Sequence, residues 1–215
     1  MRELAAFPWE RARPVRSFSW RPGQRHRPGL AFMESTGRGH GFESLAERRA
    51  LTVLDFCGQV REVLSQPFSL RFFDSDHRRE HVPDFLVATE GSTLLIDVRP
   101  AHLVKESDVA VFAATGRVAA SAGWRYLVVT GWRDGVAGTV EALARVRRPC
   151  TDPMRLEEQL LAAAVGPRRF GELVEATPWP VPARSHLLRL LWLRRLAFDL
   201  VRPLEDSTWI YPVAS

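Results

Sequence analysis

Three carboxylates in this chain stand where folding could bring them to a single metal ion. Asp84 and Asp97 flank a short apolar stretch, and Glu47 lies upstream of both. Carboxylate oxygens are the ligands that a hard divalent cation such as Mg²⁺ prefers, and the backbone carbonyl of Val98 would add a further oxygen. Arg99 adds a fixed cation that can neutralise developing negative charge. These residue types predict a divalent-cation site.

A β-hairpin predicted over residues 81–101 would position two of the carboxylates. Apolar and polar residues alternate with a period of two on both sides of a turn at Gly91. A hairpin centred on that turn sets Asp84 opposite Val98 and diagonal to Asp97. Its apolar residues favour a core position, where an unpaired aspartate would be costly. The alternative is a surface hairpin with ordinary charges.

A helix predicted over residues 42–56 would position the third carboxylate. At 3.6 residues per turn, Glu43 and Glu47 share a stripe with Leu51, and that stripe faces inward. Asp55 falls on the polar face. A carboxylate on the inward face of a helix is paired, bound to metal, or at the edge of the packing. The alternative to a metal site is an ion pair with a neighbouring arginine.

The order of these motifs resembles the PD-(D/E)xK nuclease signature, with arginine in the place of the usual lysine. The motifs ES-x-x-E, QPF, PDFLV and IDVRPA, over residues 14 to about 147, resemble TnsA, the endonuclease subunit of heteromeric transposons. The resemblance implies that four residues are catalytic: Glu47, Asp84, Asp97 and Arg99. It implies that the metal is held by Glu47, Asp84, Asp97 and Val98.

The resemblance implies an Mg²⁺-dependent DNA endonuclease, with Mn²⁺ able to substitute, that cuts one strand at each transposon end. The implied partners are DNA, an integrase-like transposase subunit and an AAA+ ATPase regulator. Arg99 can supply electrostatic help but cannot act as a general base. Because Lys105 is the one lysine among 30 basic residues, a bias toward arginine also explains the departure. Two alternatives stay open: a stand-alone restriction or repair nuclease, and a catalytically silent DNA-binding scaffold subunit.

Basic residues are concentrated at the start of the chain. Residues 1–41 contain eight arginines and three glutamates, which accounts for the whole net charge of +5. Interleaved aromatic residues such as Phe7 and Trp9 suit base stacking, and arginines suit phosphate contacts. The alternative is a flexible basic leader with no specific ligand. The arginines expected to bind DNA are Arg16, Arg21, Arg25 and Arg27.

The chain is expected to be α/β, with a restriction-endonuclease-like mixed sheet flanked by helices and a C-terminal winged-helix domain. The expected parts are a basic segment at 1–41, a nuclease core at 42–147, a linker at 148–153 and the winged-helix domain at 154–215. Further core elements are expected as strands at 60–64, 68–73 and 125–130, a polar turn at 74–80, and helices at 105–122 and 137–147.

The C-terminal domain is expected to contain three helices, at 154–165, 170–176 and 182–196, and then a hairpin. The hairpin strands are expected at 198–202 and 208–211. The third helix is apolar around most of its circumference, which favours a protein partner over the reading of DNA bases.

Composition limits the remaining possibilities. The chain has 215 residues, 46% of them hydrophobic, which is enough for a sizeable core and a small second domain. We expect a soluble, cytoplasmic protein without a membrane segment, because no long apolar run or secretory leader is found. Cys57 and Cys150 have no metal-ligand spacing, so ordinary packing in a reducing compartment is expected. His77, His81 and His102 are expected to be solvated or to contact phosphate.

Overall fold

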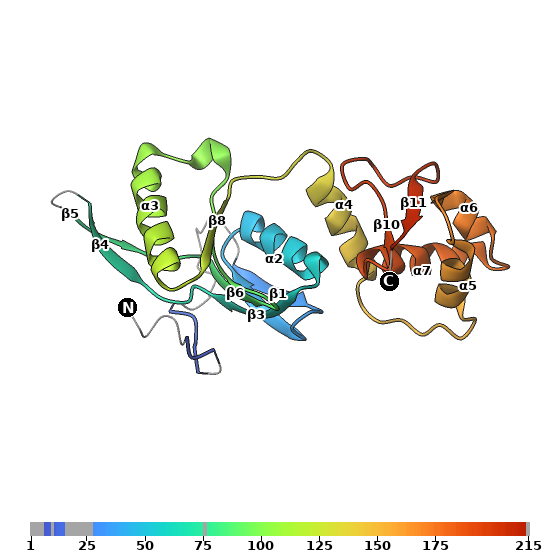
Figure 1. Ribbon diagram of the computed structural model, residues 1–215, viewed down its shortest axis with the longest axis horizontal. Helices are drawn as coiled ribbons and strands as arrows, with labels where there is room; N and C mark the ends of the chain where they lie inside the picture. The colour runs from blue at the N-terminus through green and yellow to red at the C-terminus, as the bar shows by residue number, and fades with distance from the viewer. Residues whose placement is uncertain (1–6, 10, 16–27, 75–76, 214–215) are drawn as a thin grey trace. The chain divides into compact units, whose positions relative to one another are not determined.

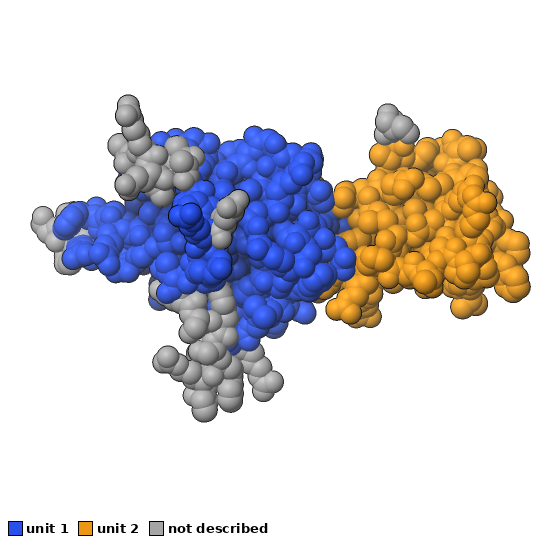
Figure 2. All heavy atoms as spheres, turned by 90° about the horizontal axis from the view of Figure 1, so that it is seen from below, with its two compact units in different colours: residues 1–131 blue, residues 132–215 orange. Residues whose placement is uncertain are grey.

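The computed structural model describes residues 7–9, 11–15, 28–74 and 77–213. The chain is a mixed α/β protein that divides into two compact units (Figures 1 and 2). Unit 1 spans Met1–Gly131 and unit 2 spans Trp132–Ser215. None of the helices in the described ranges has the length and apolar character needed to cross a membrane.

A four-stranded sheet forms the centre of unit 1. Its order is β3-β6-β7-β8, from Val60–Ser65, Phe85–Thr89, Thr93–Val98 and Arg125–Val129. The first three strands are antiparallel, whereas β8 runs parallel to β7. A parallel neighbour requires a crossover connection, and α3 (Glu106–Ser121) supplies it. The expected mixed sheet with flanking helices is therefore present.

The register of the β6–β7 hairpin is one residue away from the prediction. Phe85 pairs with Ile96, and Leu86 pairs with Leu95. The Thr89 side chain accepts from the Ser92 N–H and donates to its carbonyl, which closes a turn with two residues between them. This turn is not centred on a single glycine, so the paired positions are shifted by one residue, and the Asp84 N–H donates to the Ile96 carbonyl. The predicted pairing of Asp84 with Val98 is wrong.

The hydrophobic cluster on one side of this sheet reaches the start of the chain. Leu86 and Leu95 lie at its centre with Trp124, and Phe7 and Trp9 pack against it. The Phe7 ring lies 5.3 Å from the Trp9 ring and 6.1 Å from the Trp124 ring, centroid to centroid. These two N-terminal aromatic residues therefore serve packing, so the alternative of a flexible leader is wrong for them.

Residues 29–42 form a hairpin that the sequence did not suggest, β1 (Gly29–Met33) with β2 (Arg38–Phe42). Helix α2 (Leu45–Cys57) contacts both strands. Asp55, expected on the polar face of this helix, is buried. Its carboxylate accepts the N–H groups of Glu34 and Ser35 at 3.1 and 2.9 Å. A buried carboxylate on α2 thus fixes the β1–β2 turn.

A second hairpin replaces the predicted polar turn at 74–80. β4 (Leu70–Asp74) pairs with β5 (His77–His81) in an antiparallel ladder. The exposed face of β4–β5 carries ion pairs such as Arg71 with Glu80. The polar sequence was typical of a loop, but its charges are satisfied across strands. The hairpin places His81 just before the carboxylate-bearing strands.

Unit 2 begins earlier than the expected linker at 148–153. The predicted helix at 137–147 is α4 (Val136–Leu143) followed by a 3₁₀ turn (Ala144–Val146), and both contact α7 (Pro180–Trp192). Val140 and Leu143 of α4 are buried. This apolar contact makes α4 a part of unit 2, so the chain divides before α4 and not after it.

The rest of unit 2 combines helices with a small sheet. Helices α5 (Leu156–Ala163) and α6 (Phe170–Glu175) pack on α7. The three-stranded sheet has the order β10-β11-β9, from Leu196–Ala197, Trp209–Pro212 and Arg168–Arg169. The predicted strand at 198–202 is wrong, because the pairing strand is β10, which directly follows the turn after α7.

The apolar circumference of α7 has a structural explanation. Leu187, Leu190, Leu191 and Trp192 are at most 3% exposed. In the described part of unit 2, this helix is contacted by α4, α5, α6, the 3₁₀ turn and β10. The inference that this helix has spare apolar surface for a protein partner is therefore wrong, since α4 was not counted in the C-terminal core.

Candidate metal site

The three predicted carboxylates line one cavity of about 580 Å³ in unit 1. Glu47 comes from the first turn of α2, Asp84 from the residue before β6, and Asp97 from the end of β7. Val98 and Arg99 line the same cavity. All five residues predicted for catalysis or metal binding are thus brought together, although they come from three separate elements.

Asp84 is held by its own backbone and by the neighbouring strand. Its N–H donates to the Ile96 carbonyl at 3.1 Å, and its Oδ2 accepts the Val98 N–H at 2.6 Å. Oδ1 takes no hydrogen bond from the part of the chain that the structure describes. In an extended strand a residue's N–H and C=O point the same way. The Val98 carbonyl therefore lies on the side of the strand that faces Asp84.

The electrostatics around Asp84 oppose its ionisation. Burial raises the pKa of this carboxyl well above its usual value, and the nearby charges of Glu47 and Asp97 raise it further. The hydrogen bond from the Val98 N–H acts in the opposite direction but is outweighed. A site that crowds carboxylates in a region of low polarity is one that a divalent cation would stabilise.

Asp97 is almost fully buried and accepts hydrogen bonds from two side chains. His81 Nε2 lies 3.1 and 3.0 Å from its two carboxylate oxygens, and the Tyr126 hydroxyl donates to Oδ2 at 2.5 Å. Burial and the Asp97 charge both raise the pKa of Tyr126, so this hydroxyl keeps its proton and remains a donor. These contacts fix the orientation of Asp97. His81 is therefore neither solvated nor free for phosphate, as the sequence had suggested.

Glu47 closes the first turn of α2. Ser44 is the N-cap residue, and its hydroxyl accepts the Glu47 N–H at 3.2 Å. The Glu47 carboxylate accepts the Glu43 N–H and the Ser44 hydroxyl, both at 2.7 Å. This reciprocal capping explains the burial of a carboxylate at the start of a helix. Glu43 precedes the helix, so its predicted place on the helical stripe is wrong.

Arg99 forms an ion pair within the cavity wall. Its Nε donates to Asp108 Oδ2 at 3.0 Å, and the same oxygen accepts the Lys105 N–H at 3.1 Å. The hydrogen bond from Lys105 and the Arg99 charge lower the pKa of Asp108. Asp108 therefore stays ionised and holds the guanidinium at the edge of the cavity.

Gln66 links the metal-site aspartate to the N-terminal segment. Its N–H donates to the Asp84 carbonyl at 2.8 Å, and its own carbonyl accepts the Val15 N–H at 3.0 Å. Its backbone has a φ of 48°, in the left-handed region that few residues other than glycine adopt. This conformation lets the Gln66 N–H bond to Asp84 while its carbonyl bonds to Val15, just after the end of β3.

The donor set fits Mg²⁺. It consists of oxygens alone: the Asp84 and Asp97 carboxylates, the Val98 carbonyl and, across the cavity, the Glu47 carboxylate. A carboxylate has about four lone-pair directions, so the hydrogen bonds at Asp97 and Glu47 leave room for a cation. Hard oxygen donors with excess negative charge select Mg²⁺ or Mn²⁺ over softer metals. The residues present therefore suit the ion that the sequence motifs imply.

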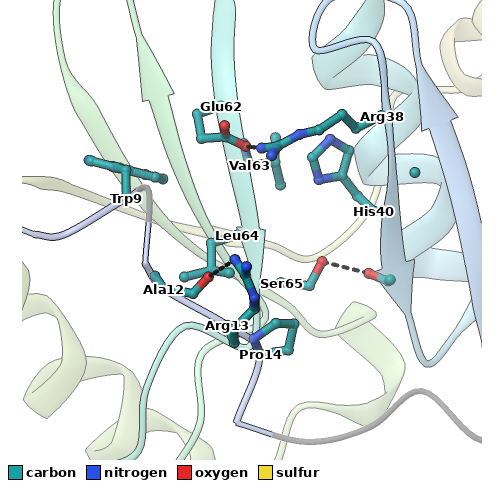
Figure 3. Close-up of a pocket in the computed structure, with 12 residues that line it drawn as sticks. Trp9, Ala12, Arg13, Pro14, Arg38, His40, Glu62, Val63, Leu64 and Ser65 are labelled. Carbon is teal, nitrogen blue, oxygen red and sulfur yellow. Dashed lines mark hydrogen bonds and ion pairs between the residues drawn. The ribbon is translucent and has the colours of Figure 1, made fainter.

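A second cavity in unit 1, of about 360 Å³, has a different character (Figure 3). Arg13 and Arg38 lie on its walls, and Arg38 pairs with Glu62. Burial lowers the pKa of His40, which also lines it. With one carboxylate already paired to arginine, this cavity does not gather metal ligands. The four arginines predicted to bind DNA (Arg16, Arg21, Arg25 and Arg27) lie outside the described residues.

No protein family model and no curated protein sequence matches this chain. The geometry must therefore support any functional conclusion. Sequence reasoning missed three residues at the site: His81, Tyr126 and Asp108. Tyr126 was within a predicted strand, and Leu95 pairs with it in the parallel register of β7 and β8. The register of β7 and β8 brings Tyr126 to Asp97, and the sequence alone does not determine that register.

Proposed function

We propose that this protein is an Mg²⁺-dependent DNA endonuclease, a TnsA-like subunit that cuts one strand at transposon ends together with an integrase-like transposase. The observation that carries the proposal is the convergence of Glu47, Asp84 and Asp97 with the Val98 peptide on one cavity. The transposase, an AAA+ regulator and transposon-end DNA as partners rest on the motif resemblance alone.

Each side chain has a distinct role in the proposed reaction. Asp84 and Asp97 would hold the cation with the Val98 carbonyl, and Glu47 would hold a second ion or orient water. The bound ion would supply Lewis-acid stabilisation of charge on the scissile phosphate. His81 and Tyr126 keep the Asp97 carboxylate in place through their hydrogen bonds. Arg99 lies at the cavity edge, where its charge would stabilise the phosphate in the transition state.

A catalytically silent subunit is the second candidate, and the hydrogen bonding of the site favours it. Glu47 and Asp97 accept hydrogen bonds within the protein, and Arg99 is paired with Asp108. Polar groups that are already hydrogen-bonded within the protein would also suit a scaffold that retains the fold of a nuclease without its chemistry. The two candidates differ in metal binding, because a silent scaffold has no need of the cation.

The experiment is strand cleavage of transposon-end DNA in Mg²⁺, with the full chain alone and with an integrase-like transposase added. Asp84→Asn should abolish cutting. Glu90→Gln is the matched control, because Glu90 is an exposed carboxylate on the turn of the same hairpin, paired with Arg61. Cutting without the transposase would indicate a stand-alone nuclease. Intact DNA in every arm, with no Mg²⁺ bound in calorimetry, would refute the proposal and favour the scaffold.

We also infer the finer fold relationships from topology. In unit 1, the candidate ligands lie at the ends of adjacent strands in a mixed sheet, an arrangement that supports a restriction-endonuclease-like core. In unit 2, helices α5, α6 and α7 followed by β10 and β11 support a winged-helix relationship. The short strand β9, which pairs with β11, suits the same interpretation. Bound DNA in a solved complex would test which element of unit 2 meets the duplex.

A further inference from the structure

Unit 2 contains a group of metal-ligating side chains that plays no part in the proposed cleavage site. Cys150, Glu157 and His186 each offer a ligand atom, and these atoms all lie within 4.8 Å of one another. They come from the loop before α5, from α5 and from α7. The two cysteines of the chain were expected to pack in the core, but both are exposed. The Cys150 thiol is thus accessible beside a buried imidazole.

Two of the three distances among these atoms are close to the edges of a tetrahedral zinc site. Cys150 Sγ lies 3.8 Å from His186 Nδ1, and Glu157 Oε1 lies 3.4 Å from the same nitrogen. Usual zinc bond lengths and a tetrahedral angle give about 3.6 Å between sulfur and nitrogen and about 3.4 Å between nitrogen and oxygen. The group therefore needs little rearrangement to hold an ion.

The far side of the imidazole carries the carboxylate that often orients a metal-bound histidine. Asp152 Oδ1 lies 3.8 Å from His186 Nε2. Asp152 is itself held by the N–H groups of Leu156 and Glu157, at 2.7 and 2.9 Å. A carboxylate at this position favours the tautomer with its proton on Nε2. The Nδ1 lone pair then points to the thiol and to Glu157.

We propose that Cys150, Glu157 and His186 form a Zn²⁺ site that ties the loop before α5 to α7. A thiolate and an imidazole select Zn²⁺ over Mg²⁺, and three protein ligands leave one position for water or another donor. Arg189 Nη1 donates to Glu157 Oε1 at 3.0 Å and holds the carboxylate toward the group. The remaining lone pairs of that carboxylate are available to the ion. This site is independent of the proposed nuclease chemistry.

The test titrates Co²⁺, a spectroscopic substitute for Zn²⁺, into the full reduced chain. We expect a thiolate-to-cobalt charge-transfer band that saturates at one equivalent and disappears when Zn²⁺ displaces the probe. Cys150→Ser should abolish the band. Cys57→Ser is the matched control, because it removes the other exposed thiol, at the end of α2, and should leave the band unchanged. The carboxylate site of unit 1 has no sulfur ligand, so cobalt there gives no such band.

Stability gives a second measurement that does not depend on the probe. A saturating concentration of Zn²⁺ should raise the unfolding temperature of unit 2 by about 5 °C or more, and Cys150→Ser should lose that shift. Glu157→Gln, at a partly exposed position, should weaken binding at least tenfold without the folding risk of replacing buried His186. A wild-type protein without the charge-transfer band, or a band of equal strength in Cys150→Ser, would overturn the proposal. Asp84→Asn should leave the band intact, which separates this site from the nuclease.

Discussion

At the scale of single residues, the ionisation of Asp84 decides how the candidate metal site behaves. Its carboxyl is crowded by burial, by Glu47 and by Asp97, and its raised pKa is the measure of that crowding. A cation that binds the ionised form relieves the repulsion. Removal of the Asp84 charge should therefore stabilise the metal-free protein and destabilise the metal-bound protein.

Asp84→Asn should stabilise the metal-free protein at neutral pH and remove its response to Mg²⁺. The amide oxygen can still accept the Val98 N–H, while the repulsion among carboxylates is lost. We expect an unfolding temperature about 2–4 °C higher than that of the wild type without metal. In millimolar Mg²⁺ the order should reverse. Differential scanning calorimetry of wild type, Asp84→Asn and Glu90→Gln checks this, and a variant that still gains stability from Mg²⁺ would contradict it.

The pH dependence follows from the same carboxyl. Because the pKa of Asp84 is raised in the folded protein, its contribution to stability is present below the ordinary value of 3.8 and is lost as the pH rises through the raised value. Mg²⁺ requires the ionised carboxylate, so its affinity should fall as the pH drops below that raised value. Calorimetric titrations at several pH values test this. Affinity that does not fall as the pH is lowered would contradict this link between the ionisation of Asp84 and metal binding.

Arg99 is the residue whose role the motif resemblance leaves most open. Arg99→Ala should reduce strand cleavage by about two orders of magnitude or more, because the charge that stabilises the transition state is lost. Arg99→Lys should retain or raise activity, since lysine restores the commoner arrangement. Single-turnover cleavage rates distinguish these outcomes. If Arg99→Ala cuts as fast as wild type, its pair with Asp108 is purely structural, and Lys105→Ala becomes the next variant to measure.

At the scale of secondary-structure elements, α2 organises the start of unit 1. Its first turn holds Glu47 and its last turn holds Asp55, which caps the β1–β2 turn. Asp55→Ala should lower the free energy of unfolding by about 1–3 kcal/mol, because two backbone N–H groups lose their acceptor. Asp55→Asn should fall between, and Thr52→Ala on the same helix should change little. Urea unfolding gives all four values; equal values for Asp55→Ala and Thr52→Ala would contradict this role.

The sequence predictions were accurate where a local residue pattern determines the element, and wrong where contacts between distant residues determine it. Alternation placed strands β6 and β7 correctly, because burial of one face enforces the period of two. Their register was wrong by one residue, since it depends on the side-chain bonds of Thr89 and Ser92 in the turn. Asp55 was wrongly predicted to be exposed, because its hydrogen-bond partners lie in the β1–β2 hairpin, which no local sequence pattern predicted. The convergence of the carboxylates was predicted because a candidate metal site limits residue type as well as position.

At the scale of the whole molecule, the boundary at Gly131 makes a prediction about truncation. Every residue of the candidate metal site lies within unit 1. A fragment of residues 1–131 should therefore keep its stabilisation by Mg²⁺. A fragment of residues 1–147 carries α4 without α7, which exposes Val140 and Leu143. Size-exclusion chromatography with light scattering should show more self-association for the longer fragment. A monomeric 1–147 fragment and an aggregated 1–131 fragment would place the boundary where the sequence had suggested.

Truncation of unit 2 should also expose apolar surface. Residues 132–215 include α4, whereas residues 154–215 leave the α7 surface that contacts α4 uncovered. The shorter fragment should be the less soluble of the two, and any self-association it shows would arise from truncation. The self-association and the partner binding of this unit should therefore be measured on the longer fragment.

The short path through Gln66 has a thermodynamic consequence. Val15 donates to Gln66, and Gln66 donates to the carbonyl of Asp84, so the chain just before the arginine-rich stretch is joined by backbone hydrogen bonds to a candidate metal ligand. A DNA contact with this stretch that shifts Val15 would change the free energy of placing Asp84. Coupling between two binding events is reciprocal. Magnesium would then raise the affinity for DNA by the same factor by which DNA raises the affinity for magnesium.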